Sequence, residues 1–99
     1  MGIRERVETV TDQETRPPTM YKVVLLNDDF TSMEFVVQVL MQLFHHSQEG
    51  AVEIMLNIHK KGRGVCGVYT REIAETKVAQ VHQLAKSHAY PLRATIEEE

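Results

Sequence analysis

The chain has 99 residues, 42% of them hydrophobic, which fits one ordinary domain with a small core. Its 11 basic and 14 acidic residues give a formal charge of -3, so electrostatics favour neither nucleic acid nor an anionic membrane as a partner. Cys66 is the only cysteine, which excludes an intrachain disulfide, and its apolar neighbours predict a buried thiol.

The amino-terminal segment differs in composition from the rest of the chain. Residues 1–18 are rich in charged side chains, poor in large apolar ones, and end at Pro17-Pro18, so we expect a flexible extension. Residues 19–99 are then the core domain. No signal-peptide segment or bilayer-length apolar stretch is present, which predicts a soluble, cytoplasmic protein without a membrane partner.

The first predicted strand is the apolar run Tyr21–Leu26, which is apolar on both faces and therefore predicts an interior strand. Asn27, Asp28 and Asp29 follow it directly. Two interpretations of this cluster remain open: a turn in which the side chains bond their own backbone, or a seat for a cation. Among cations we favour an amine, because two carboxylates and an amide are few ligands for a divalent metal.

Two helices are predicted next. Thr31-Ser32-Met33-Glu34 matches a capping box, with Thr31 and Glu34 satisfying each other's backbone donors. The helix that it opens has apolar side chains at helical spacing, namely Phe35, Val36, Val39, Leu40, Leu43 and Phe44. Ser47 is expected to cap a second helix that ends at Gly62.

The remaining elements complete the fold class. We predict a second strand over Gly64–Tyr69, a third helix from the cap Thr70 to His88, and a last strand over Leu92–Ile96 after Pro91. The order β-α-α-β-α-β predicts an α+β sandwich, in which three helices pack on one face of a three-stranded antiparallel sheet.

Two apparent motifs carry little weight. Residues 62–67 satisfy G-x-G-x-x-G, but they follow a predicted helix and open a strand, the reverse of a dinucleotide loop. None of the five histidines pairs at i, i+4, so His45, His46, His82 and His88 are interpreted as solvated or packed side chains. His59 differs because it shares a helical face with Met55.

Strand, acidic turn and capped helix together resemble the ClpS family, the bacterial adaptors that deliver N-degron substrates to the ATP-dependent ClpAP protease. The resemblance covers roughly residues 16–98 and rests on five stretches in the family's order: 21–36, 55–59, 64–70, 74–79 and 88–92. It implies the family's fold, which is similar to the carboxy-terminal domain of the ribosomal stalk. Agreement in several separate parts is more specific than any single short motif.

The resemblance implies a site for a free amino-terminal Phe, Tyr, Trp or Leu. An α-amino group is mostly protonated at neutral pH and presents three N–H donors. By similarity to the family, Asn27 and His59 contact this amine directly, while Asp28 and Asp29 hold the amine or the first peptide unit, one of them through water. The division of roles between the two aspartates is left open.

The resemblance also implies an apolar pocket for the first side chain. The family's pocket corresponds here to Leu25, Leu26, Thr31, Met33, Val36, Met55, Ile58 and Leu92. Met33 is expected to act as a gate that refuses the β-branched residues Ile and Val.

Two positions depart from the family's pattern. Ser32 replaces the usual proline, from which we expect a less rigid helix start. Ile58 replaces the usual valine, and one added methylene in a pocket wall shifts selectivity by roughly 1–3 kcal/mol. We therefore hypothesise a narrower substrate range than that of a typical member.

Delivery implies a second surface. By resemblance it includes Tyr69, Glu72 and Lys77, which are expected to dock on the N-terminal domain of the ClpA unfoldase, and the amino-terminal extension is expected to engage the unfoldase too. For Glu72 and Lys77 the plain alternative is a solvated helix face. A monomer is the simpler expectation.

The predicted protein is thus a non-enzymatic adaptor without a cofactor or metal. Two other classes remain as alternatives. One is a small cation-dependent hydrolase built on Asn27, Asp28, Asp29 and His59, although no nucleophile accompanies these residues. The other is a purely structural interaction domain, because fold alone does not fix function.

Overall fold

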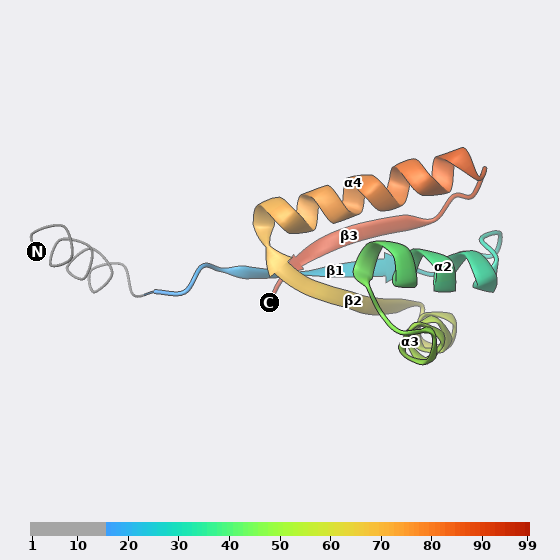
Figure 1. Cartoon of the computed structure of the whole chain (residues 1–99), viewed down its shortest axis with the longest axis horizontal. Helices are drawn as coiled ribbons and strands as arrows, with labels where there is room; N and C mark the ends of the chain where they lie inside the picture. Colours follow the sequence, from blue (N-terminus) through green and yellow to red (C-terminus); the bar gives the residue numbers. More distant parts are fainter. Residues whose placement is uncertain (1–15) are drawn as a thin grey trace, which may run out of the picture.

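A computed structural model describes residues 16–99 (Figure 1). Its elements are β1 (Met20–Leu26), α2 (Met33–Phe44), α3 (Gln48–Lys61), β2 (Arg63–Thr70), α4 (Arg71–Ser87) and β3 (Arg93–Glu98). This order confirms the predicted β-α-α-β-α-β sequence. The predicted extension lies, as far as residue 15, outside the described residues.

The three strands of the described chain form one antiparallel sheet in the order β2-β1-β3. β1 pairs along both edges, which confirms the interior strand predicted from its two apolar faces. Its pairing with β2 shifts register between Val23 and Val24, where Cys66 is the extra residue of a bulge. At the end of β1, Leu26 lies opposite both Arg63 and Arg93.

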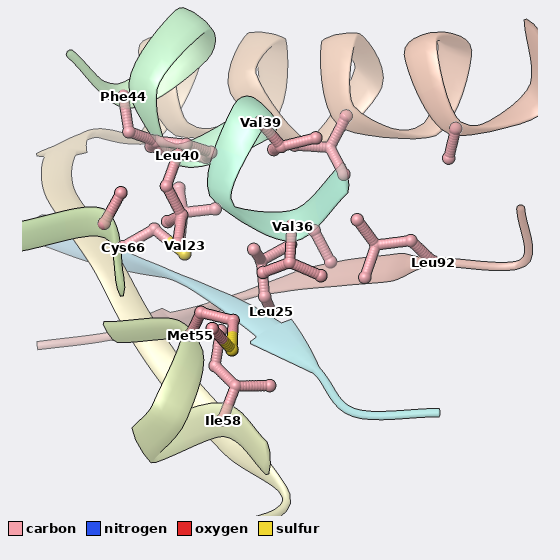
Figure 2. Packing of buried hydrophobic residues seen from close by; sticks show 14 of the residues in the cluster. Val23, Leu25, Val36, Val39, Leu40, Phe44, Met55, Ile58, Cys66 and Leu92 are labelled. Atoms are coloured by element: carbon pink, nitrogen blue, oxygen red, sulfur yellow. The ribbon is translucent and has the colours of Figure 1, made fainter. Parts of the chain in front are cut away.

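One face of this sheet carries the core. Val23 and Leu25 of β1 are fully buried and belong to a cluster with side chains from α2, α3 and α4 (Figure 2). All three helices therefore cover the same face, as predicted. Cys66 is buried in this cluster, and burial raises the pKa of its thiol to about 12, so it behaves as the small hydrophobic side chain that was expected.

The start of α2 differs from the predicted capping box. Ser32, not Thr31, is the N-cap, and its hydroxyl accepts a hydrogen bond from the Phe35 N–H at 3.1 Å. Thr31 instead donates both its backbone N–H and its hydroxyl to the Asp28 carboxylate, so its N–H does not bond Glu34 as a capping box requires. The Ser32 hydroxyl makes a bond that proline could not make, and the less rigid helix start expected from the missing proline stays a prediction.

The other helix ends follow the prediction closely. Ser47 caps α3 by accepting from the Gly50 N–H, and Gly62 ends α3 in the left-handed conformation at φ 89°. Thr70 is the N-cap of α4, although its side chain makes no capping hydrogen bond. Within residues 16–99, no helix has both the length and the apolar character needed to cross a membrane.

Three of the histidines interpreted as packed or solvated bond the backbone. His46 Nε2 lies 2.6 Å from the Cys66 carbonyl oxygen, at the bulge of β2. His82 Nε2 accepts from the Ala94 N–H of β3 at 3.0 Å, and His88 Nδ1 lies 3.1 Å from the Leu84 carbonyl. His45 is exposed at the end of α2. These four histidines have structural or solvated positions, which leaves His59 as the one to explain.

Candidate functional site

The site begins where β1 ends. The Asn27 N–H donates to the Gly62 carbonyl at 2.9 Å, and the Gly62 N–H in turn donates to the Ile58 carbonyl at 2.8 Å. These two bonds fix the turn after β1 against the last turn of α3. His59 belongs to that same turn of helix, so the acidic turn and His59 are brought to one place although they are far apart in sequence.

Asp28 holds the turn together. Its Oδ1 accepts from the N–H groups of Phe30 and Thr31 at 2.8 and 2.7 Å, and its Oδ2 accepts from the Thr31 hydroxyl at 2.8 Å. Partial burial alone would raise the pKa of Asp28, but the hydrogen bonds from Thr31 and Phe30 outweigh it and lower the pKa. For Asp28, the backbone-bonding interpretation of the acidic cluster is therefore correct.

A cavity of about 220 Å³ opens beside this turn. It is lined by residues from the turn, α2 and α3: Asn27, Asp28, Asp29, Thr31, Met33, Val36, Met55, Ile58 and His59. The volume is below the roughly 300–1,000 Å³ of pockets for drug-sized ligands. The cavity therefore suits one amino-acid side chain and the atoms next to it.

The polar lining is available to a ligand. Asn27, Asp29 and His59 are exposed, and none of their side chains is engaged in a hydrogen bond within residues 16–99. An amide oxygen, a carboxylate and a ring nitrogen are acceptors suited to an ammonium group. Asp28, by contrast, already uses both carboxylate oxygens. The carboxylate of Asp29 is thus free to accept from a ligand, whereas that of Asp28 already accepts hydrogen bonds within the turn.

The apolar lining comes from two helices that converge beside the end of β1. Figure 2 shows Val36 of α2 facing Met55 and Ile58 of α3, and all three are buried. Met33 is 45% exposed although it lines the cavity, which places it at the mouth. This is a position from which it could gate entry.

Gly64 fixes the position of Ile58. A Cβ atom at Gly64 would lie 2.5 Å from Ile58 Cγ1, so only glycine allows α3 to pack this closely on β2. Sequence reasoning missed this role and interpreted Gly64 only as the first residue of the second strand. An isolated glycine in an otherwise strand-like pattern was the signal, because it often marks a close approach.

Three residues predicted to line the pocket lie elsewhere. Leu25 and Leu92 are buried in the core cluster, and neither lines the cavity. Leu26 is 36% exposed and lies on the opposite face of β1 from Leu25, because successive strand residues point to opposite faces. A role of these three residues in the pocket therefore stays a prediction, and Leu25 and Leu92 belong to the core cluster behind the cavity.

The three predicted docking residues differ in accessibility. Glu72 is exposed in the first turn of α4. Lys77 is part-buried: its ammonium group donates to the Leu43 carbonyl at 2.6 Å and lies 5.7 Å from the centre of the half-buried Tyr69 ring. Lys77 therefore joins the end of α2 to α4, and the plain alternative of a solvated side chain does not describe it.

Metal ligation has no support in the part of the chain that the structure describes. Residues 16–99 contain no group of three or more His, Cys, Asp or Glu side chains that could hold an ion. The acidic turn contributes two carboxylates, of which Asp28 is occupied by the turn itself. The polar side chains of the turn and the apolar side chains of α2 and α3 thus line one and the same cavity.

Comparison with known proteins gives a consistent result. Residues 16–95 match the family model described as ATP-dependent Clp protease adaptor protein ClpS. The ClpS adapter of Phenylobacterium zucineum is 56% identical over 98 residues, covering 99% of this chain and 90% of that protein. The ClpS adapter of Desulforapulum autotrophicum is 54% identical over 98 residues, covering 99% and 94%.

A solved structure is also similar. It is Agrobacterium tumefaciens ClpS2 bound to L-phenylalaninamide, which is 42% identical with a TM-score of 0.81. The match covers 84% of this chain and 100% of that one. That ligand carries a free amino group and an aromatic side chain on the same carbon atom.

Proposed function

The chain belongs to the ClpS family of ATP-dependent Clp protease adaptors, and from this premise we propose that it binds the free amino-terminal Phe, Tyr, Trp or Leu of N-degron substrates and delivers them to the ClpAP protease. Members of the family are adaptors and not enzymes. The hydrolase alternative is therefore set aside.

The observation that carries the proposal is the composition of one small cavity. Its lining combines the free acceptors Asn27, Asp29 and His59 with a buried apolar wall. An amino-terminal Phe or Leu presents the matching pair of groups, a charged amine and a large apolar side chain, on one carbon atom. An internal Phe or Leu lacks the amine and is not bound.

The amine is held by Asn27, Asp29 and His59, with His59 in its neutral form so that one ring nitrogen can accept. Asp28 shapes the turn and contacts the substrate less directly, since its carboxylate is already bonded. A sheltered charge-assisted hydrogen bond contributes roughly 1.5–3 kcal/mol. The relative bound to L-phenylalaninamide supports this part of the proposal, because that ligand carries the same two groups.

The first side chain enters between Met33, Val36, Met55 and Ile58. Burying a Phe or Leu side chain there contributes on the order of 1.5–3 kcal/mol, which is comparable with one amine contact. Neither group suffices alone, and this makes binding specific for chain ends. Met33 at the mouth refuses Ile and Val, whose branched β-carbon it would meet first.

For delivery, we propose that Tyr69, Glu72 and Lys77 form the face that docks on the N-terminal domain of ClpA. Residues 1–18 are proposed as a flexible extension that engages the unfoldase, with residues 19–99 as the core domain. A monomer in the cytoplasm fits this role, because the protease and its substrates meet there.

The test is fluorescence anisotropy with a labelled peptide that begins with Phe, its N-acetylated twin and an Ile-first version. The free Phe peptide should bind, whereas acetylation removes the charge and should weaken binding at least tenfold. The Ile-first peptide should also bind weakly. If acetylation leaves the affinity unchanged, the amine site is wrong and so is the adaptor mechanism built on it.

A matched pair of variants locates the amine site. Asn27→Ala should weaken binding of the Phe peptide roughly tenfold, because it removes one acceptor for a charged donor. Asn57→Ala is the control, because Asn57 is an exposed asparagine of α3 that does not line the cavity. An equal loss of affinity for the Phe peptide in the two variants would show that Asn27 does not contact the amine.

A further inference from the structure

Phe30 is the most exposed of the large hydrophobic side chains in residues 16–99, with 79% of its surface accessible. It is not among the side chains packed on the core, and within this range no aromatic pair includes it. It is also not part of a hydrophobic staple, because that contact uses the residue immediately before the N-cap, which is Thr31. The ring therefore has no evident role in stabilising the fold.

The backbone that carries this ring is nevertheless held firmly. The Phe30 N–H donates to Asp28 Oδ1 at 2.8 Å, and the next N–H, of Thr31, donates to the same oxygen at 2.7 Å. Both neighbours of Phe30 in sequence, Asp29 and Thr31, line the cavity, whereas Phe30 itself does not. The backbone of Phe30 thus lies at the rim of the cavity, and its ring lies outside the cavity.

An extended peptide places successive side chains on opposite sides of its backbone. If the first side chain fills the cavity and the amine meets Asn27, Asp29 and His59, then the second side chain must point out of the cavity, over the rim. A ring fixed at that rim offers it an apolar surface at little entropic cost, because the backbone of the turn is already ordered.

We propose that Phe30 contacts the side chain of the substrate's second residue and favours large apolar residues at that position. This inference rests on the proposed function, since it uses the position of the first residue. It adds a second specificity determinant outside the cavity, with a chemistry that is separate from amine recognition.

The experiment compares labelled peptides that begin Phe-Leu and Phe-Gly and are otherwise identical, so that no charge near Asp28 and Asp29 changes. The wild-type chain should bind the Phe-Leu peptide roughly three- to tenfold more tightly, the range expected of an aromatic–aliphatic contact. In Phe30→Ala this ratio should fall below about twofold, while affinity for the Phe-Gly peptide stays within about twofold of wild type.

Leu56→Ala is the matched control, because Leu56 is a 52% exposed apolar residue of α3 that does not line the cavity. It should keep the wild-type ratio. A wild-type ratio near one, or equal weakening of both peptides by Phe30→Ala, overturns the inference while leaving the proposed function intact. Failure of both peptides to bind the wild-type chain overturns the proposed function and this inference with it.

Discussion

At the scale of single residues, Ile58 is the most buried side chain of the apolar cavity wall. It is buried on α3, and Gly64 of β2 lies so close behind it that even a Cβ atom would collide with Ile58 Cγ1. The side chain therefore cannot retreat when a large ligand group enters. Close-packed side chains move little. The extra methylene of isoleucine, compared with valine, therefore reduces the volume that is left for the substrate side chain.

We predict that Ile58→Val broadens the substrate range. In the wild-type chain, affinities for peptides beginning with Phe, Tyr, Trp and Leu should differ, with the largest side chain, Trp, binding least well. The substitution should improve Trp binding by roughly tenfold, within the 1–3 kcal/mol expected for one methylene. Anisotropy titrations with the four peptides measure this.

The control is Ile54→Val, which makes the same change in a partly buried residue of α3 outside the cavity. It should leave the four affinities in their wild-type order. Equal affinity of the wild-type chain for all four peptides would contradict the hypothesis of a narrow range.

At the scale of elements, the turn between β1 and α2 is a small structure of its own. One carboxylate, that of Asp28, accepts three hydrogen bonds and sets the path of the backbone from Asn27 to the helix start. Its pKa is lowered because these bonds outweigh the effect of burial. A group with a lowered folded pKa stabilises the fold above its ordinary pKa, and this contribution is lost as the pH falls through the folded value.

We therefore predict that Asp28→Asn lowers the free energy of unfolding by about 1–2 kcal/mol at neutral pH, because charge-assisted hydrogen bonds are lost. The gap between variant and wild type should narrow as the pH falls below the ordinary carboxyl range, since wild-type Asp28 then becomes protonated as well. Urea unfolding at neutral pH and at about pH 3 measures both effects.

The control is Asp29→Asn, which removes the same charge from a side chain without hydrogen bonds in residues 16–99. It should leave stability nearly unchanged while weakening peptide binding. If both variants destabilise the fold equally, the turn does not depend on the Asp28 bonds.

Much of the local structure could be predicted from the sequence, but the start of α2 could not. The interior strand, the Ser47 cap and the end of α3 at Gly62 all follow from local pattern, because strand pairing and capping depend on neighbouring residues. The capping box at Thr31 was wrong because the pattern cannot show that Asp28, and not Glu34, accepts the Thr31 N–H. The competition between acceptors is settled only once the chain has turned.

The chemistry of the candidate site could be predicted from the sequence, but not every residue that lines the cavity. Polar groups on the turn and apolar groups on helix faces were placed by resemblance, and most of them line the cavity. Leu25 and Leu92 do not line it. The sequence shows that a residue is hydrophobic, but it does not distinguish a side chain that lines a cavity from one that packs in the core behind it. The support of Ile58 by Gly64 joins two elements that no local pattern connects.

At the scale of the whole molecule, the cavity and the proposed docking face lie at opposite ends of β1. The cavity follows Leu26, whereas Tyr69 pairs with Tyr21 near the start of the strand and leads into α4 (Figure 1). Seven strand residues span roughly 20 Å. The proposed function requires such a separation, because an adaptor would bind substrate and unfoldase at the same time.

This separation makes binding and delivery experimentally distinct. We predict that Glu72→Lys, a change of charge on the exposed first turn of α4, leaves the affinity for a Phe-first peptide within about twofold of wild type. Degradation of a Phe-first reporter by ClpAP should slow roughly fivefold or more at limiting adaptor, because a reversed charge at an interface weakens docking. Lys77→Ala is a less clear probe, since losing the bond to the Leu43 carbonyl should also lower stability.

Glu53→Lys provides the control, because it makes the same charge change on an exposed position of α3 and should affect neither binding nor degradation. Anisotropy and degradation assays run in parallel on the wild-type, Glu72→Lys and Glu53→Lys chains distinguish peptide binding from delivery. A Glu72→Lys chain with which ClpAP degrades the reporter at the normal rate would exclude this part of α4 from docking. One that loses peptide binding would show instead that the two ends of β1 are coupled, and the adaptor could not then be treated as two independent surfaces joined by one strand.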